Sequence, residues 1–245
     1  MNKFVAFSGG ADSTALALLE SEAQPVFTDT GWEFPELYAH IELFEQVTGR
    51  KVVRLQSKHG TLPEYIRRQK FFPGHGSRYC TRIFKIDPYN EFIKQHLPAQ
   101  MLIGLRADEP ERIGNLTDID GMQIRYPLRE RGMNRIDVLK VCAEHDLIPR
   151  YPLYMARGGC IGCFYKRRSE VTALCNLQPE VAAGLEKLEQ EVQDKRGKFA
   201  FMFPNVAQPV KDIRRQLEMF TPDEVYASAQ QNDDVGLECG LFCNR

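Results

Sequence analysis

The sequence predicts an α/β protein with a mostly parallel sheet flanked by helices, and three observations support this. Short apolar runs of strand length recur along the first 150 residues. Between them lie segments with apolar residues at helical spacing, and Gly-rich or polar loops separate the two kinds of segment. Strands that alternate with helices indicate βαβ units and a parallel sheet.

The elements follow in order along the chain. Strands are predicted at 3–7, 25–28, 51–55 and 101–105. Helices are predicted at 14–19, 36–48, 62–69, 87–96 and 135–145, with a Pro- and Gly-containing loop at 71–77. From about residue 151 the strand pattern stops, and helices are predicted at 180–194 and 222–231. We therefore expect an α/β domain over 1–150 and a helical, cysteine-containing region with a tail over 151–245.

Composition narrows the class of protein. Hydrophobic residues make up 43% and charged residues 27% of the 245 residues, which is typical of a globular chain. A net charge of -1 argues against the global basic field of many nucleic-acid binders, although a local basic patch stays open. No segment reaches the roughly 20 apolar residues of a membrane span, and the N-terminal apolar run is too short for a signal peptide. We expect a cytoplasmic protein.

The loop after the first strand has the composition of an anion-binding turn. It contains Ser8, Gly9, Gly10, Asp12, Ser13 and Thr14. Two glycines let the backbone approach an anion closely, the hydroxyls donate hydrogen bonds, and the helix that follows offers free N–H groups at its start. No Gly-Lys-Ser/Thr follows, so this is not a Walker loop. The alternative is an ordinary tight turn that caps a helix.

Six blocks in order resemble the phosphoadenylyl-sulfate (PAPS) reductase branch of the PP-loop ATP pyrophosphatase superfamily. The first is Ser-Gly-Gly-x-Asp-Ser at residues 8–13, and the second is Asp-Thr-Gly-x-x-Phe-Pro-Glu at 29–36. The others lie at 79–88, 104–106, 145–154 and 238–241. The resemblance implies a Rossmann-like fold of the adenine nucleotide alpha-hydrolase type. It also implies an adenine nucleotide substrate, namely PAPS, adenylyl sulfate (APS) or ATP.

Several residues at the predicted strand ends are candidate nucleotide ligands. A carboxylate at Asp29 suits Mg²⁺ on a triphosphate or a ribose hydroxyl, and its alternative role is to cap the helix near residue 36. The cations of Arg82, Lys85 and Arg106 match phosphosulfate oxygens, or else they are solvated surface charges. The resemblance adds Thr30 and Gly104 to the expected nucleotide site.

Seven cysteines, an odd number, favour thiol chemistry or metal over a disulfide framework. Cys160 and Cys163 form a Cys-x-x-Cys pair, which is typical of an iron–sulfur or zinc site, a redox dithiol or two packed thiols. Cluster-bearing APS reductases, which the chain resembles here, imply a 4Fe-4S cluster, with zinc as the alternative. The expected ligands are Cys80, Cys160, Cys163 and Cys175, with Cys243 as the alternative fourth ligand.

Cys239 lies in Glu-Cys-Gly-Leu, the block in which the similar reductases carry their nucleophile. A thiolate there would attack the sulfate sulfur, and thioredoxin or a glutathione-type reductant would release sulfite. The alternative is a terminal segment whose cysteines are incidental.

Three functions follow, of which a sulfonucleotide reductase ranks first. An ATP-dependent sulfurtransferase that modifies a nucleic acid ranks second, favoured by the altered cysteine spacing and the basic run at 166–168. A non-enzymatic nucleotide- or redox-sensing module ranks third. No membrane partner is expected, and homo-oligomerisation stays open.

Overall fold

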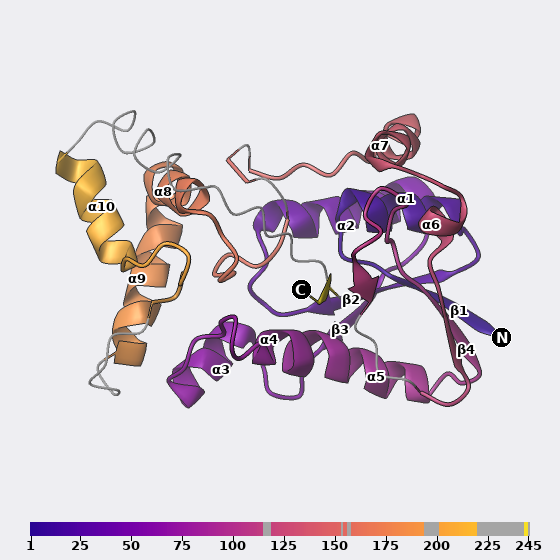
Figure 1. Cartoon of the computed structure of the whole chain (residues 1–245), viewed down its shortest axis with the longest axis horizontal. Coiled ribbons are helices and arrows are strands. Elements are labelled where there is room, and N and C mark those ends of the chain that lie inside the picture. The colour runs from indigo at the N-terminus through magenta and orange to yellow at the C-terminus, as the bar shows by residue number, and fades with distance from the viewer. Residues whose placement is uncertain (115–118, 153, 156–157, 194–200, 220–242, 245) are drawn as a thin grey trace.

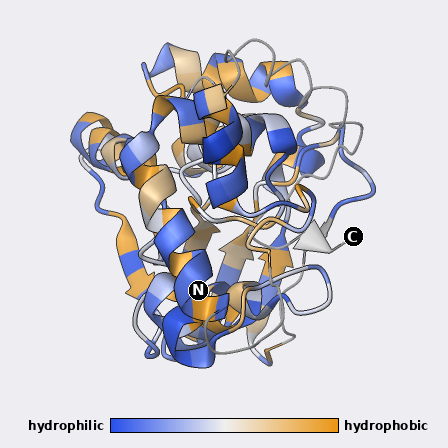
Figure 2. Cartoon of the chain, turned by 90° about the vertical axis from the view of Figure 1, so that its left-hand side faces the viewer, coloured by the Kyte–Doolittle hydropathy of each residue, from blue (hydrophilic) through white to orange (hydrophobic). Residues whose placement is uncertain are grey.

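A computed structural model describes residues 1–114, 119–152, 154–155, 158–193, 201–219 and 243–244. Figure 1 shows an α/β part with a central sheet and, beside it, a group of three helices near one end of the sheet. Figure 2 shows helices that carry both hydrophilic and hydrophobic stretches, as expected when one face of each is buried.

The sheet has five strands, all parallel, in the order β3-β2-β1-β4-β6. Their bounds are β1 Asn2–Ala6, β2 Gln24–Asp29, β3 Val53–Gln56, β4 Ala99–Leu102 and β6 Met122–Arg125. The chain runs outward from β1 to β3 and then returns to the other side of β1 at β4. The strand order therefore reverses between β1 and β4, and the carboxyl ends of these two strands are where an open parallel sheet binds its ligand.

Helices cover both faces of the sheet (Figure 1). One face carries α1 Ala11–Leu19, α2 Pro35–Thr48, α6 Pro127–Glu130 and α7 Arg135–Glu144. The other carries α5 Asp87–Lys94, which continues from α4 Tyr79–Thr81 and the π-helical segment η1 Arg82–Ile86. Side chains of β1 alternate between the faces: Val5 packs on the α1 side and Phe4 on the α5 side.

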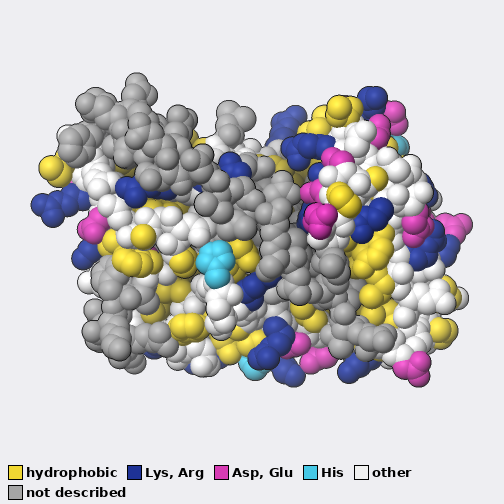
Figure 3. Space-filling view, viewed as in Figure 1, with side chains coloured by type: hydrophobic (Ala, Val, Ile, Leu, Met, Phe, Trp, Pro, Cys, Tyr) yellow, Lys and Arg dark blue, Asp and Glu magenta, His cyan; other side chains and the backbone are white. Residues whose placement is uncertain are grey.

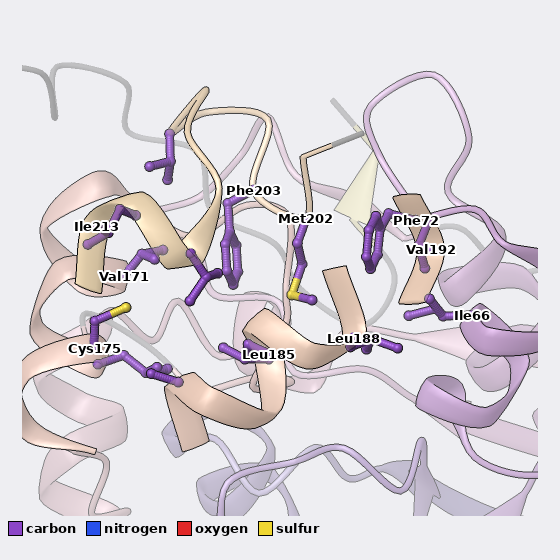
Figure 4. Close-up of a cluster of buried hydrophobic side chains, with 14 of the residues drawn as sticks. Ile66, Phe72, Val171, Cys175, Leu185, Leu188, Val192, Met202, Phe203 and Ile213 are labelled. Atoms are coloured by element: carbon purple, nitrogen blue, oxygen red, sulfur yellow. The ribbon is translucent and has the colours of Figure 1, made fainter. Parts of the chain in front are cut away.

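The C-terminal helices are α8 Arg168–Leu177, α9 Pro179–Gln193 and α10 Val210–Met219. They share a core with α3 Leu62–Gln69, in which Leu188 and Val192 meet Ile66 (Figure 4). Glu189 lies within this core at 3% exposure and accepts main-chain N–H bonds from Met202 at 2.9 Å and Val210 at 2.7 Å. One carboxylate thus ties α9 to the start of α10.

The predicted fold class is confirmed, and most predicted elements lie within a few residues of the observed ones. Three expectations need correction. β6 was missed because its side chains alternate between half-buried and exposed, and helices α8 and α10 were also missed. Strands do not stop at residue 151, because β7 Cys243–Asn244 pairs antiparallel with β5 Ile113–Gly114. The predicted helix at 222–231 lies outside the described residues. No helix of the described residues is long and apolar enough to cross a membrane.

Candidate functional site

The loop between β1 and α1 is held closed by its own serines. Ser13 Oγ accepts the Ser8 N–H at 3.0 Å and donates to the Gly10 carbonyl at 3.0 Å. Ser8 Oγ lies 3.1 Å from Ser13 Oγ. Gly9 has φ of +72°, and a methyl group there would lie 3.1 Å from Leu37 Cγ, so the position favours glycine. The predicted anion-binding turn at residues 8–13, called the phosphate loop below, is therefore compact. Hydrogen bonds of Ser8 and Ser13 within the turn hold its backbone.

The first turn of α1 points N–H groups out of the loop. Gly10 is the N-cap residue and has no side chain with which to cap the helix. The helix dipole and these N–H groups favour an anion at this place. Thr14 differs from its neighbours, because its hydroxyl is 2.9 Å from His40 Nε2 in the core and the residue is fully buried. Its hydroxyl therefore braces α1 against α2 and does not face the loop.

Gly104 brings the end of β4 against this loop. A methyl group on Gly104 would lie 3.1 Å from the Asp12 carbonyl carbon and oxygen, and 3.3 Å from the Ser13 nitrogen. Only glycine allows this approach without a shift. Gly104, which is expected in the nucleotide site, thus lies against the loop at the reversal point between β1 and β4.

Arg106 is surrounded by carboxylates. Its guanidinium is 2.8 Å from Asp12, 2.8 Å from Asp108 and 3.1 Å from Glu109, and its side chain is 8% exposed. Burial lowers the pKa of Arg106, but the hydrogen bonds that it donates to Asp108 and Asp12, together with the Asp12 charge, outweigh burial and raise it. The guanidinium lies beside the loop at residues 8–13, but its donors are used by carboxylates. An incoming phosphate would have to compete with Asp12 for it.

The segment after β2 forms a second group of polar side chains. Asp29 Oδ1 accepts the Gly31 N–H and the Tyr38 hydroxyl, each at 2.7 Å. Helix α2 is capped at Phe34, so the alternative role of Asp29 as its N-cap is wrong. Burial and the hydrogen bond to Asp29 raise the pKa of Tyr38. Asp29 keeps a half-buried carboxylate at the end of β2.

Glu33 is a buried carboxylate that the sequence reasoning missed. It is 6% exposed and accepts the Thr30 hydroxyl at 2.8 Å and the N–H groups of Thr30 and Trp32 at 3.2 and 3.1 Å. Burial raises its pKa, and the nearby Lys85 charge lowers it in part. Lys85 thus lies near the end of β2, whereas Arg82 is exposed on η1. The signal available in the sequence was an acidic residue inside the Asp-Thr-Gly-x-x-Phe-Pro-Glu block.

The Cys-x-x-Cys turn rests directly on this segment. Cys160 pairs with Glu33 in an antiparallel bridge, and its Sγ is 3.6 Å from Thr30 Oγ1 and 3.7 Å from Glu33 Oε1. A methyl group on Gly162 would lie 2.0 Å from the indole of Trp32, so only glycine fits there. Burial raises the pKa of Cys160, and the Glu33 charge adds to this. Sulfur is therefore held beside the strand ends that form the candidate nucleotide site.

The expected four-cysteine set is not assembled by the described residues, since no three His, Cys, Asp or Glu side chains among them are grouped to hold a metal ion. Cys160 and Cys163 are neighbours. Cys175 lies instead in the helical core near Val171, Leu185 and Ile213, where burial raises its pKa to about 12 (Figure 4). A thiol in apolar surroundings does not suit a cluster that requires thiolates. The metal site stays a prediction.

The end of the chain returns to the loop that follows Arg106. Cys243 is paired with Gly114 through the backbone, and Gly114 follows Arg112 by two residues. Arg112 pairs with Glu109 at 2.6 Å, which in turn pairs with Arg106. A chain of ion pairs thus runs from Arg112, the residue before β5, to Asp12 at the start of α1. Cys239 lies outside the described residues.

Comparison with known proteins agrees with this geometry. Residues 2–167 match the model of the phosphoadenosine phosphosulfate reductase domain family. Two uncharacterised proteins of Methanocaldococcus jannaschii are similar, one 33% identical over 206 residues and the other 28% identical over 107 residues. These alignments cover 78% and 42% of this chain, but only 41% and 25% of the relatives.

A solved structure of PAPS reductase from Candida auris, in complex with phosphate, is also similar. It is 14% identical, covers 66% of this chain and 83% of its own, and has a TM-score of 0.49. The family match over residues 2–167 includes the α/β part and the Cys-x-x-Cys turn, and the chain spans about two fifths of the first curated relative.

Proposed function

The chain belongs to the phosphoadenosine phosphosulfate reductase domain family, and on that premise we propose that it is a sulfonucleotide reductase. It binds PAPS or APS through the loop at residues 8–13 and reduces the bound sulfate to sulfite. The phosphates lie at the N-terminus of α1, where the loop meets Gly104. Lys85 lies near the end of β2 and contributes positive charge there, and Arg106 lies beside the loop, where a phosphate would compete with Asp12 for its guanidinium.

One observation favours reduction of the nucleotide sulfate over sulfur transfer to an acceptor. The C-terminal strand β7 pairs with β5, and Arg112, the residue before β5, is linked through Glu109 and Arg106 to Asp12 at the start of α1. Cys239 precedes Cys243 by only four residues. This supports a tail cysteine that reaches the nucleotide sulfate.

The proposed chemistry balances with an external dithiol. The Cys239 thiolate attacks the sulfate sulfur, so a sulfur–sulfur bond forms while the sulfur–oxygen bond to the nucleotide phosphate breaks. The nucleotide leaves with the electron pair of that bond. A thioredoxin or glutathione-type thiol then attacks Cys239 Sγ, which breaks the sulfur–sulfur bond, releases sulfite and leaves a mixed disulfide with Cys239. A second thiol of the reductant breaks this disulfide and frees Cys239. The reductant supplies two electrons and ends as a disulfide.

A second function is favoured by a different observation. Cys160 Sγ lies 3.6 Å from Thr30 at the strand ends, and carboxylates of Asp12 and Asp29 flank the site. A cysteine pair and acidic groups suit an ATP-dependent sulfurtransferase, in which Asp29 would hold Mg²⁺ on the triphosphate. The acceptor would be a nucleic acid. However, on the face drawn in Figure 3 the basic and acidic side chains of the described residues are interspersed over the α/β part.

Incubation of the anaerobically purified chain with PAPS, APS and ATP in separate reactions, each with a dithiol reductant, tests the proposal. We expect sulfite and a nucleotide product from a sulfonucleotide, and loss of sulfite in Cys239→Ser. Cys142→Ala is the matched control, because Cys142 is a core thiol at the α1–α7 contact and outside the proposed chemistry. Release of AMP and pyrophosphate from ATP, without sulfite from either sulfonucleotide, would refute the reductase and support the sulfurtransferase.

A further inference from the structure

Tyr151 reaches the phosphate loop from the other half of the chain. Its hydroxyl lies close to the main chain of Ala11, the first residue of α1. A methyl group built on Gly10 would lie 3.4 Å from the Tyr151 oxygen. The phenol oxygen therefore lies at the place where the first N–H groups of the helix face an anion.

The aromatic ring is held in position by the segment that precedes the Cys-x-x-Cys turn. A methyl group on Gly158 would lie 2.7 Å from Tyr151 Cε1 and 3.2 Å from Cζ, so the Gly158 backbone lies close against the ring. The ring also packs on the helical core. The hydroxyl is thus fixed beside the loop by contacts on the ring, and little rotamer freedom remains to be lost when a ligand binds.

We propose that the Tyr151 hydroxyl donates a hydrogen bond to a phosphate group of the nucleotide in the residue 8–13 loop, which makes Tyr151 a nucleotide-binding residue. This rests on the proposed function. A phenol carries one O–H donor, which the Tyr151 oxygen beside Gly10 can direct to the anion. Such a donor gives the phosphate a hydrogen bond without a positive charge. This is useful here because the Arg106 guanidinium already donates to Asp12. The family block that ends at Tyr154 leaves this position unspecified.

Calorimetric titration of the full chain with PAPS and with ATP tests the proposal. In Tyr151→Phe the ring and its packing against Gly158 remain, and only the hydroxyl is lost. We expect the Kd of the nucleotide bound by the wild-type chain to rise about tenfold, as for loss of a hydrogen bond to a charged group. Tyr65→Phe is the matched control, since Tyr65 packs among His59, Tyr79 and Phe84. Its Kd should equal that of the wild type.

Gly158→Ala provides a second variant, because the added methyl must push the ring away from the loop. We expect a similar rise in Kd for this variant, and less than about a twofold further rise when it is added to Tyr151→Phe, since the two changes remove the same contact. Far-UV circular dichroism and thermal unfolding of each variant show that the fold is kept.

An unchanged Kd in Tyr151→Phe would overturn the proposal. A lower Kd would overturn it as well, because the hydroxyl would then occupy space beside Gly10 that the phosphate needs. Either result would leave the proposed function standing, provided that the wild-type chain binds a nucleotide. Absence of binding by the wild-type chain to both nucleotides would overturn the proposed function together with this inference.

Discussion

The ion pairs of Arg106 allow a quantitative prediction about the stability of the site. Arg106 is 8% exposed, and its carboxylate partners Asp12, Asp108 and Glu109 are 25%, 40% and 11% exposed. In Arg106→Ala these carboxylates lose their shared cation. Glu109 keeps Arg112 at 2.6 Å, but Asp12 loses its ion pair. Removing one partner of a buried ion network costs about 3 kcal/mol of unfolding free energy.

A matched control separates burial from the mere number of ion pairs. Arg125 pairs with Glu130 at the surface, with side-chain exposures of 45% and 42%. Solvent and salt screen such a pair, so Arg125→Ala should cost less than about 1 kcal/mol. Urea unfolding at pH 7, followed by circular dichroism, measures both losses.

The loss in Arg106→Ala should also shrink on acidification. Burial raises the pKa of Asp108, but the Arg106 hydrogen bond and charge outweigh burial and lower it. A carboxyl whose folded-state pKa is lowered contributes stability above its unfolded pKa, and this is lost as pH falls through the folded-state value. The difference in unfolding free energy between the wild-type chain and Arg106→Ala should therefore be smaller at pH 3.5 than at pH 7. Equal losses in Arg106→Ala and Arg125→Ala, or a loss independent of pH, would refute the reasoning.

Three further predictions concern the packing around the site. Gly162→Ala forces a methyl into the Trp32 indole, so we expect a loss of about 1–3 kcal/mol in urea unfolding and a changed tryptophan emission, since Trp32 is the single tryptophan; an unchanged spectrum would contradict this contact. Burial lowers the pKa of His40 to about 4, so stability should fall by about 3 kcal/mol as pH falls from 6.5 to 4, and His40→Gln should lack this dependence in pH-resolved unfolding curves. Burial raises the pKa of Glu189. The contribution of Glu189 to the unfolding free energy is therefore complete below the pKa of the carboxyl in the unfolded chain, and it is lost as pH rises through the pKa in the folded chain. Glu189→Gln should flatten that dependence while it costs about 1–3 kcal/mol at pH 5 for a lost main-chain hydrogen bond, and an unaltered unfolding curve would show that α9 is not held this way.

The parallel sheet could be read from the sequence because its central strands are buried on both faces. Such strands appear as short apolar runs, and β1, β2 and β4 were predicted for this reason. β6 lies at the edge of the sheet, where exposed Gln123 and Arg125 interrupt the run. Pairing between β5 and β7 joins segments 130 residues apart in the chain, and a local pattern carries no information about such a contact.

The candidate site, like the sheet, has features that the sequence predicts and features that only the tertiary structure shows. A Ser-Gly-Gly turn before a helix is a local feature, so the sequence alone determined the turn at residues 8–13 and its position after the first strand. Only the tertiary structure decided which neighbours its side chains meet. Thr14 bonds to His40 in the core, Arg106 meets three carboxylates, and Cys175 lies in an apolar helix contact. Hydrogen-bond and ion-pair partners are set by the distance between elements after packing, and the spacing of residues along the chain does not contain that distance.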